Sequence, residues 1–136
     1  MEYIRLVNIT RAILARILVI DDDPWILKIF TQILESEGHS VETAVDGQEG
    51  IETYRNSQAD LVITDMVMPV KDGLKTILEL DKEFPNVKII AISGGGVIEP
   101  DRYLALAESI GTKKTLTKPV SKQDLISAVN EVLTMA

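Results

Sequence analysis

The stretch Ile17-Leu18-Val19-Ile20-Asp21-Asp22-Asp23-Pro24 decides the fold. Four consecutive aliphatic residues are expected of a strand that is buried on both faces of a sheet. Pro24 suits the first turn of a helix, and apolar residues then recur at helical spacing as far as Gly38, a natural helix stop. A buried strand that leads directly into an amphipathic helix is the repeating unit of α/β proteins.

The same unit recurs along the chain. Further strands are expected over 40–45, 60–65, 87–92 and 113–117, the first at a sheet edge because its polar and apolar residues alternate. Asp72-Gly73 marks a turn, and helices are expected over about 47–55, 74–84 and 101–110, with a last one that Ser121 caps. This (βα)5 alternation predicts a parallel five-stranded sheet with right-handed crossovers and helices on both faces.

Length and composition narrow the function classes. A chain of 136 residues is expected to form one domain, and the absence of cysteine excludes disulfides and thiolate metal sites. The net charge of −7 with only 14 basic residues makes direct binding to nucleic acid or to a membrane surface an unfavoured interpretation. No apolar run approaches the roughly 20 residues that span a bilayer, so a cytoplasmic location is expected.

The first fifteen residues precede the first predicted strand. Glu2, Arg5 and Arg11 interrupt this segment, which therefore lacks the unbroken apolar stretch of a signal peptide. We interpret residues 1–15 as an N-terminal appendage, with a functional docking segment as the alternative, and place the domain at residues 16–136.

Chemically active side chains follow the predicted strands. Asp21 and Asp22 come after the first strand, whereas Asp65, Ser93 and Lys118 close later ones. The carboxyl ends of parallel strands meet at one edge of a sheet, so these side chains are expected to converge there. Adjacent carboxylates repel one another unless a cation neutralises them, and Mg²⁺ prefers such oxygen ligands. The local alternative for the aspartates is an acidic helix N-terminus, which the helix dipole favours.

The later strand ends suggest phosphoryl transfer. A carboxylate such as Asp65 can act as a nucleophile toward phosphorus, given a metal and a cation to neutralise charge. Lys118 can be that cation, and the Ser93 hydroxyl can donate to a phosphoryl oxygen. Taken without the other residues, Lys118 would be interpreted as a surface lysine and Ser93 as a loop hydroxyl. The bond between Lys118 and Pro119 is a candidate for the cis form.

From about residue 16 to residue 133 the chain resembles the receiver domain of two-component response regulators, and it is similar to the single-domain chemotaxis regulators. Intervals of 43, 28 and 25 residues separate Asp22, Asp65, Ser93 and Lys118. The motifs that carry the resemblance are Ile17-Leu18-Val19-Ile20-Asp21-Asp22-Asp23-Pro24, Asp65-Met66-Val67-Met68-Pro69 with Asp72-Gly73, Ile89-Ile90-Ala91-Ile92-Ser93, and Thr117-Lys118-Pro119.

The resemblance implies a flavodoxin-like, three-layer fold with strand order 2-1-3-4-5. It implies that Asp65 accepts a phosphoryl group from the phosphohistidine of a sensor histidine kinase or a phosphotransfer protein, with Ser93 and Lys118 as phosphoryl contacts. It further implies a downstream target protein, a monomer or weak dimer, and no enzyme activity beyond self-catalysed phosphorylation and dephosphorylation. The implied ligands of Mg²⁺ are Asp21, Asp22, Asp65 and the backbone carbonyl of Val67.

This chain departs from the family pattern in three places. Thr115 stands where an aromatic switch residue is usual, and Gly94-Gly95-Gly96 follows the phosphoryl-contact serine. We expect that loop to be mobile without phosphate, since glycine loosens a loop, with a phosphate-cradling nest as the competing interpretation. Val67 and Gly95 occupy the two positions that tune hydrolysis, and neither can orient a water, so no especially fast self-dephosphorylation is expected.

Two alternative functions are compatible with parts of this pattern. A metal-dependent phosphohydrolase would use a similar acid cluster, but its nucleophile is expected after the first strand rather than the third. A degenerate receiver would act as a constitutive protein-interaction module.

The remaining distinctive residues are given structural roles. His39, the only histidine, is expected at the surface because it lies in a turn. Trp25 is expected to pack rather than to contact a ligand, and Met66 and Met68 are expected to pack beside the site.

Overall fold

The computed structural model describes residues 14–66, 68, 72–94 and 112–135. Strands and helices alternate through this part of the chain, apart from the interval between the last two strands, most of which lies outside it. In order, the elements are β1 (Arg16–Ile20), α2 (Pro24–Ser36), β2 (Ser40–Ala44), α3 (Gly47–Asn56), β3 (Leu61–Asp65), α4 (Gly73–Glu83), β4 (Ile89–Ser93), β5 (Lys114–Thr117) and α6 (Lys122–Leu133).

Several expectations fall outside the described residues. They concern the helix over 101–110, the loop glycines Gly95 and Gly96, the carbonyl of Val67 and most of the N-terminal appendage. The described elements match the expected ones to within two residues at each strand end, which is the usual latitude of such boundaries.

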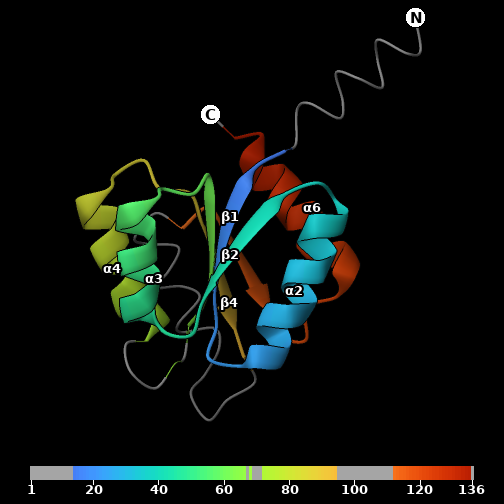
Figure 1. Ribbon diagram of the computed structural model, residues 1–136, viewed down its shortest axis with the longest axis horizontal. Coiled ribbons are helices and arrows are strands. Elements are labelled where there is room, and N and C mark those ends of the chain that lie inside the picture. The colour runs from blue at the N-terminus through green and yellow to red at the C-terminus, as the bar shows by residue number, and fades with distance from the viewer. Residues whose placement is uncertain (1–13, 67, 69–71, 95–111, 136) are drawn as a thin grey trace, which may run out of the picture.

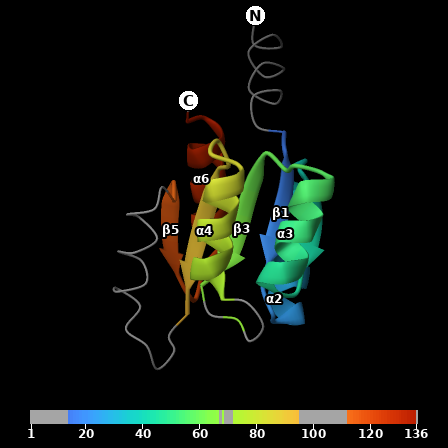
Figure 2. The same cartoon turned by 90° about the vertical axis from the view of Figure 1, so that its left-hand side faces the viewer.

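The five strands form one parallel sheet in the order β2-β1-β3-β4-β5. This confirms the order that the family resemblance implied and places β2 at an edge, as its alternating sequence predicted. Helices α3 and α4 cover one face of the sheet, and α2 and α6 cover the other (Figures 1 and 2). The result is the three-layer α/β sandwich typical of flavodoxin-like proteins.

Alternate residues of the strands face opposite layers. Leu18 and Ile20 of β1 pack with α3 and α4, whereas Ile17 and Val19 pack with α2 and α6. All four of these side chains are about 1% exposed. A strand with two buried faces must be apolar at every position, which is why its sequence reads as a continuous aliphatic run rather than an alternating one.

Side-chain caps fix where each helix begins. Asp23, Asp46, Asp72 and Ser121 each accept a hydrogen bond from a backbone N–H in the first turn of the helix that follows. Ser121 is thus confirmed as an N-cap. The stop predicted at Gly38 is also confirmed, since this residue has φ of +95°, a left-handed conformation that favours glycine. No helix in the described ranges is both long and apolar enough to cross a membrane.

Candidate phosphoryl-acceptor site

The parallel register brings the predicted side chains to one edge of the sheet. Ile20, the last residue of β1, pairs with Thr64, so Asp21, which follows β1, lies beside Asp65 at the end of β3. On the other side of β3, Asp65 pairs with Ile92, and Ser93 follows at the end of β4. Lys118 comes directly after β5, whose last residue pairs with Ser93.

The centre of the site is an ammonium group shared by two carboxylates. The Nζ atom of Lys118 lies 3.2 Å from Asp21 Oδ2 and 3.4 Å from Asp65 Oδ2. Asp21 is 2% exposed and Asp65 is 5% exposed, so both carboxylates are largely removed from water. Ion pairs in such surroundings are less screened than pairs at the surface, and Lys118 therefore holds the two strand ends together electrostatically.

The pKa shifts reflect this arrangement. Burial raises the pKa of Asp21 above its usual value, and the neighbouring Asp22 adds to the rise, against the Asp23 N–H and Lys118, which lower it. Burial alone would lower the pKa of Lys118, but the carboxylates of Asp65 and Asp21 outweigh it and the pKa is raised. Lys118 is therefore cationic at neutral pH, yet its single charge leaves the acidic cluster incompletely neutralised.

Backbone groups orient the acidic residues. The Asp23 N–H donates to Asp21 Oδ1 at 2.9 Å, and Asp23 Oδ1 in turn accepts the Trp25 N–H at 2.9 Å as the cap of α2. These bonds leave Asp22 exposed beside the buried pair. The run of three aspartates thus serves two purposes: the third starts a helix, as the local interpretation required, and the first two face the site.

The donor set suits a hard divalent cation. One carboxylate oxygen from each of Asp21, Asp22 and Asp65 lies within 4.8 Å of the others. Oxygen ligands of this kind are those that Mg²⁺ binds, with water filling the remaining positions of its octahedron. The fourth ligand implied by the resemblance, the carbonyl of Val67, lies outside the described residues.

Ser93 and Lys118 are joined through the backbone. The Lys118 N–H donates to the Ser93 carbonyl at 2.7 Å, while the Ser93 hydroxyl donates to the Gly94 carbonyl at 3.4 Å. Ser93 is 3% exposed. The structure therefore places its hydroxyl at the same sheet edge as the carboxylates. The Lys118–Pro119 peptide bond is cis, as predicted.

Gly73 is a residue of the site that the sequence interpretation missed. Asp72-Gly73 was expected to form a turn, but Asp72 is the N-cap of α4 and Gly73 is its first residue. The Gly73 N–H donates to the Met66 carbonyl at 3.0 Å, and a Cβ at this position would overlap the Asp65 carbonyl oxygen. The Asp-Gly pair is the available signal, since glycine also marks places where backbones approach closely.

Two of the structural roles assigned from sequence are wrong. Trp25 is 63% exposed and does not pack in the core; its ring lies 5.6 Å from the Lys28 ammonium. His39 is only 4% exposed, not at the surface, and its ring accepts a hydrogen bond from the Ala15 N–H just before β1. Met66 and Met68 are buried at 0% and 7% exposure, which confirms that they pack.

An apolar groove of about 490 Å³ opens beside the Lys118 side chain. Its walls come from α2 and from the segment between β5 and α6, and the residues that line it with Lys118 are Ile26, Ile29, Phe30, Pro119 and Val120. The groove places exposed apolar surface next to a charged site, an arrangement typical of a contact surface for another molecule.

Comparisons with known proteins agree with this geometry. Residues 17–130 match the response regulator receiver domain family. The transcriptional regulatory protein GlrR of Escherichia coli K12 is 39% identical over 119 residues, which are 88% of this chain but only 26% of that protein. The chain thus spans about a quarter of that relative's length. The chemotaxis protein CheY of Treponema pallidum is 38% identical, with 87% of this chain and 82% of that protein covered.

Solved structures show the same fold. A crystal structure of a response regulator receiver domain protein from Clostridium thermocellum superimposes with a TM-score of 0.80 at 37% identity, covering 88% of this chain and 94% of that one. The receiver domain of NtrX from Brucella abortus gives a TM-score of 0.82 at 28% identity, with 88% and 99% covered.

Proposed function

Because the chain belongs to the response regulator receiver domain family, we propose that it is a phosphorylation switch in which Asp65 accepts a phosphoryl group from a phosphohistidine. One observation carries the proposal: the Lys118 ammonium lies within 3.4 Å of carboxylate oxygens of both Asp21 and Asp65. A buried carboxylate beside a fixed cation and further oxygen donors is the arrangement that phosphoryl transfer to a carboxylate requires.

The proposed chemistry is a single in-line displacement. An oxygen of Asp65 forms a bond to phosphorus while the bond from phosphorus to the imidazole nitrogen of the donor breaks. Lys118 stabilises the charge on the phosphoryl oxygens, and the Ser93 hydroxyl turns from its long bond with Gly94 to donate to one of them. Mg²⁺ bound by Asp21, Asp22 and Asp65 would supply further neutralisation of the same oxygens.

The donor is proposed to be a sensor histidine kinase or a phosphotransfer protein. The apolar groove beside Lys118 supports a macromolecular donor, because a helix with an apolar face could bury Ile26, Ile29 and Val120 while presenting a histidine to the site. Small acyl phosphates would react at the same carboxylate without using the groove.

We propose that the signal to a downstream protein arises from a change in the ion pairs around Asp65. Phosphorylation adds roughly −1.5 to −2 charges at Asp65. Lys118 is then attracted to the phosphoryl group, and its backbone bond to Ser93 carries the change to β4 and β5. Thr115 is half-buried on β5 where a large aromatic is usual in the family, so we propose that the hydroxyl and lysine steps transmit the signal to a downstream protein.

The test is intact mass after incubation with Mg²⁺ and acetyl phosphate. We expect one phosphoryl adduct on the wild type, none on Asp65→Asn, and loss of the reaction in EDTA. Asp81→Asn, which removes a carboxylate on α4, is the control and is expected to react as the wild type does. Absence of an adduct at intact Mg²⁺ binding would overturn the proposal and favour the constitutive interaction module.

A further inference from the structure

The single histidine of the chain is buried at the sheet edge opposite the carboxylates. His39 is 4% exposed, and its Nδ1 atom accepts a hydrogen bond from the Ala15 N–H at 3.1 Å. A nitrogen that accepts from a backbone N–H carries no proton, so the ring is neutral with its proton on Nε2. The proposed phosphoryl chemistry makes no use of this residue.

Both backbone polar groups of Ala15 are hydrogen-bonded to the segment that follows α2. While its N–H bonds the His39 ring, its carbonyl accepts the Ser40 N–H at 3.0 Å. Leu14 lies over Gly38, where its Cδ2 atom occupies the space that a Cβ would need. The chain that enters β1 is therefore fastened to residues 38–40, with His39 supplying the only side-chain bond among these contacts.

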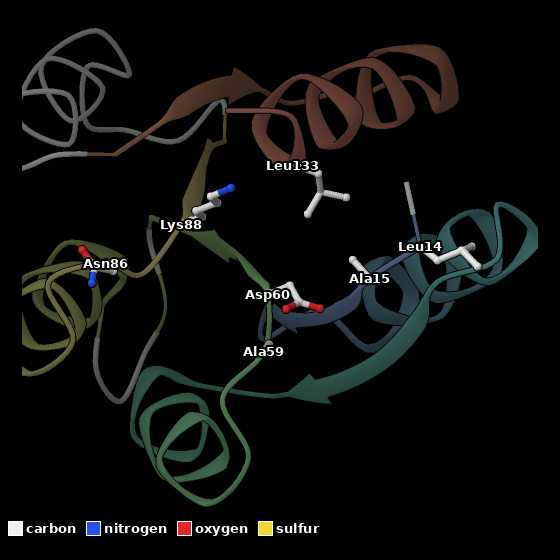
Figure 3. Close-up of a pocket in the computed structure, with 7 residues that line it drawn as sticks. All are labelled: Leu14, Ala15, Ala59, Asp60, Asn86, Lys88 and Leu133. Carbon is white, nitrogen blue, oxygen red and sulfur yellow. The ribbon is translucent and has the colours of Figure 1, made fainter. Parts of the chain in front are cut away.

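The fastened segment also forms the wall of a cavity. A hollow of about 410 Å³ lies at this edge of the domain. The side chains that line it, drawn in Figure 3, are those of Leu14, Ala15, Ala59, Asp60, Asn86, Lys88 and Leu133. Ala15 packs against one side of the buried apolar cluster between the sheet and α6, and Leu133 and Met135, at and just after the end of α6, pack against the same cluster. Movement of Leu14 and Ala15 would open this cavity and expose the end of that cluster.

The charges near the His39 ring do not offset the effect of burial on its pKa. Burial lowers the pKa of His39 below its usual value, and Glu37, in the same turn, raises it by less. The Arg16 guanidinium on β1 is engaged by Glu42 and by the Ser57 hydroxyl.

The other charged groups of this edge have partners of their own. Asp60 before β3 accepts the Arg16 N–H, and the Lys88 ammonium donates to the Met135 carbonyl. Nothing among these contacts would compensate a proton added to the His39 ring.

We propose that His39 and Ala15 form a pH-sensitive latch that fastens Leu14 and Ala15, which precede β1, to the domain at neutral pH and releases them on acidification. A proton on Nδ1 would place a donor against the Ala15 N–H donor and put an uncompensated charge in a buried site. Opening the latch removes both costs, since the ring then reaches water. Acidification thus uncovers the cavity of Figure 3 and the end of α6 without touching the phosphoryl-acceptor edge.

The test is hydrogen exchange of the Ala15 amide, read by NMR alongside the resonance of the single histidine. As the pH is lowered from the ordinary histidine pKa of about 6.5 toward the lower pKa of the latched ring, we expect the protection factor of Ala15 to fall, by at most about tenfold per pH unit. His39→Asn is the matched variant, because its Oδ1 can accept the same N–H without titrating, and its Ala15 protection should stay constant. The Val62 amide in the sheet serves as the internal reference.

Three outcomes would overturn the latch. Constant Ala15 protection through the histidine titration would show that protonation does not open it, and an equal loss of protection in His39→Asn would show that another group is responsible. Should the variant fail to fold, the wild-type titration still decides, since a His39 pKa at or above 6.5 contradicts a buried neutral acceptor.

Discussion

Lys118 and Asp65 are 53 residues apart in the sequence, yet the Lys118 ammonium lies 3.4 Å from Asp65 Oδ2. The contact exists because β5 and β3 end at the same edge of one parallel sheet, on either side of β4. Only a quarter of the Lys118 side chain is exposed, and Asp65 is nearly inaccessible. A cation held so close to the proposed nucleophile would stabilise charge that develops on a transferring phosphoryl group, without first having to move into place.

Removal of this cation is expected to slow phosphorylation strongly. For Lys118→Ala we expect the rate of adduct formation with acetyl phosphate to fall by about 10²-fold to 10³-fold, which is typical for loss of one preorganised electrostatic group. The measurement is a time course of intact mass at fixed Mg²⁺. Lys114→Ala removes a lysine of β5 that pairs with Glu131 of α6 outside the site; it is the control and should react at the wild-type rate. Equal rates in the two variants would contradict the role of Lys118.

Mg²⁺ binding is expected to be visible through Trp25. This residue is the only tryptophan of the chain, and its backbone N–H donates to the carboxylate of Asp23, which adjoins the acidic pair. We expect Mg²⁺ to change its fluorescence and, at ten times the dissociation constant, to stabilise the fold by about 1.4 kcal/mol in thermal or denaturant unfolding. Asp22→Asn should weaken binding with little loss of metal-free stability, because the side chain is exposed. Glu35→Gln, which removes a carboxylate near the other end of α2, is the control and should bind Mg²⁺ as the wild type does.

Gly73 is expected to be essential for the position of Asp65. A Cβ at residue 73 would overlap the Asp65 carbonyl oxygen and the Met66 Cα, so the start of α4 or the end of β3 must shift. We expect Gly73→Ala to cost about 1–3 kcal/mol in the free energy of unfolding, as overpacking does. At Gly94 a Cβ would meet only Lys118 Cδ, at 3.7 Å, so Gly94→Ala should change stability by less than about 0.5 kcal/mol. Equal costs for the two variants in urea unfolding would refute the close approach.

Most of the fold could be predicted from the sequence, because the patterns that indicate its strands and helices are local and periodic. The aliphatic run at Ile17–Ile20 and the caps at Asp23 and Ser121 each act within one element or at one element end, and all are found in the structure. The convergence of Asp21, Asp65 and Lys118 was also predictable, because the parallel sheet assembles its strand ends without any detail of packing.

The errors arise where distant segments meet. His39 was assigned to the surface because it follows a turn glycine, but residues 14 and 15, whose position no local pattern reveals, cover its ring. Trp25 is apolar and adjoins the apolar face of α2, yet its place in the first turn directs it to solvent. The Asp72-Gly73 pair alone predicts a turn. The close approach of Gly73 to the Asp65 carbonyl oxygen is a tertiary contact, and no local sequence pattern reveals it.

The last prediction concerns Tyr54, which packs edge-on against Phe84 with ring centroids 4.8 Å apart. Burial, with a smaller contribution from Asp60, raises the pKa of this phenol above the ordinary value of 10.0. The folded state therefore keeps its proton after the unfolded state has lost it. The stability that this provides is complete below pH 10 and is lost as the pH rises toward the folded-state pKa, with a slope of at most about 1.4 kcal/mol per pH unit. Urea unfolding between pH 9 and pH 11 measures the slope, and Tyr54→Phe, which keeps the ring contact, should lack this contribution. Identical slopes for the two proteins would show that Tyr54 titrates alike in the folded and unfolded states.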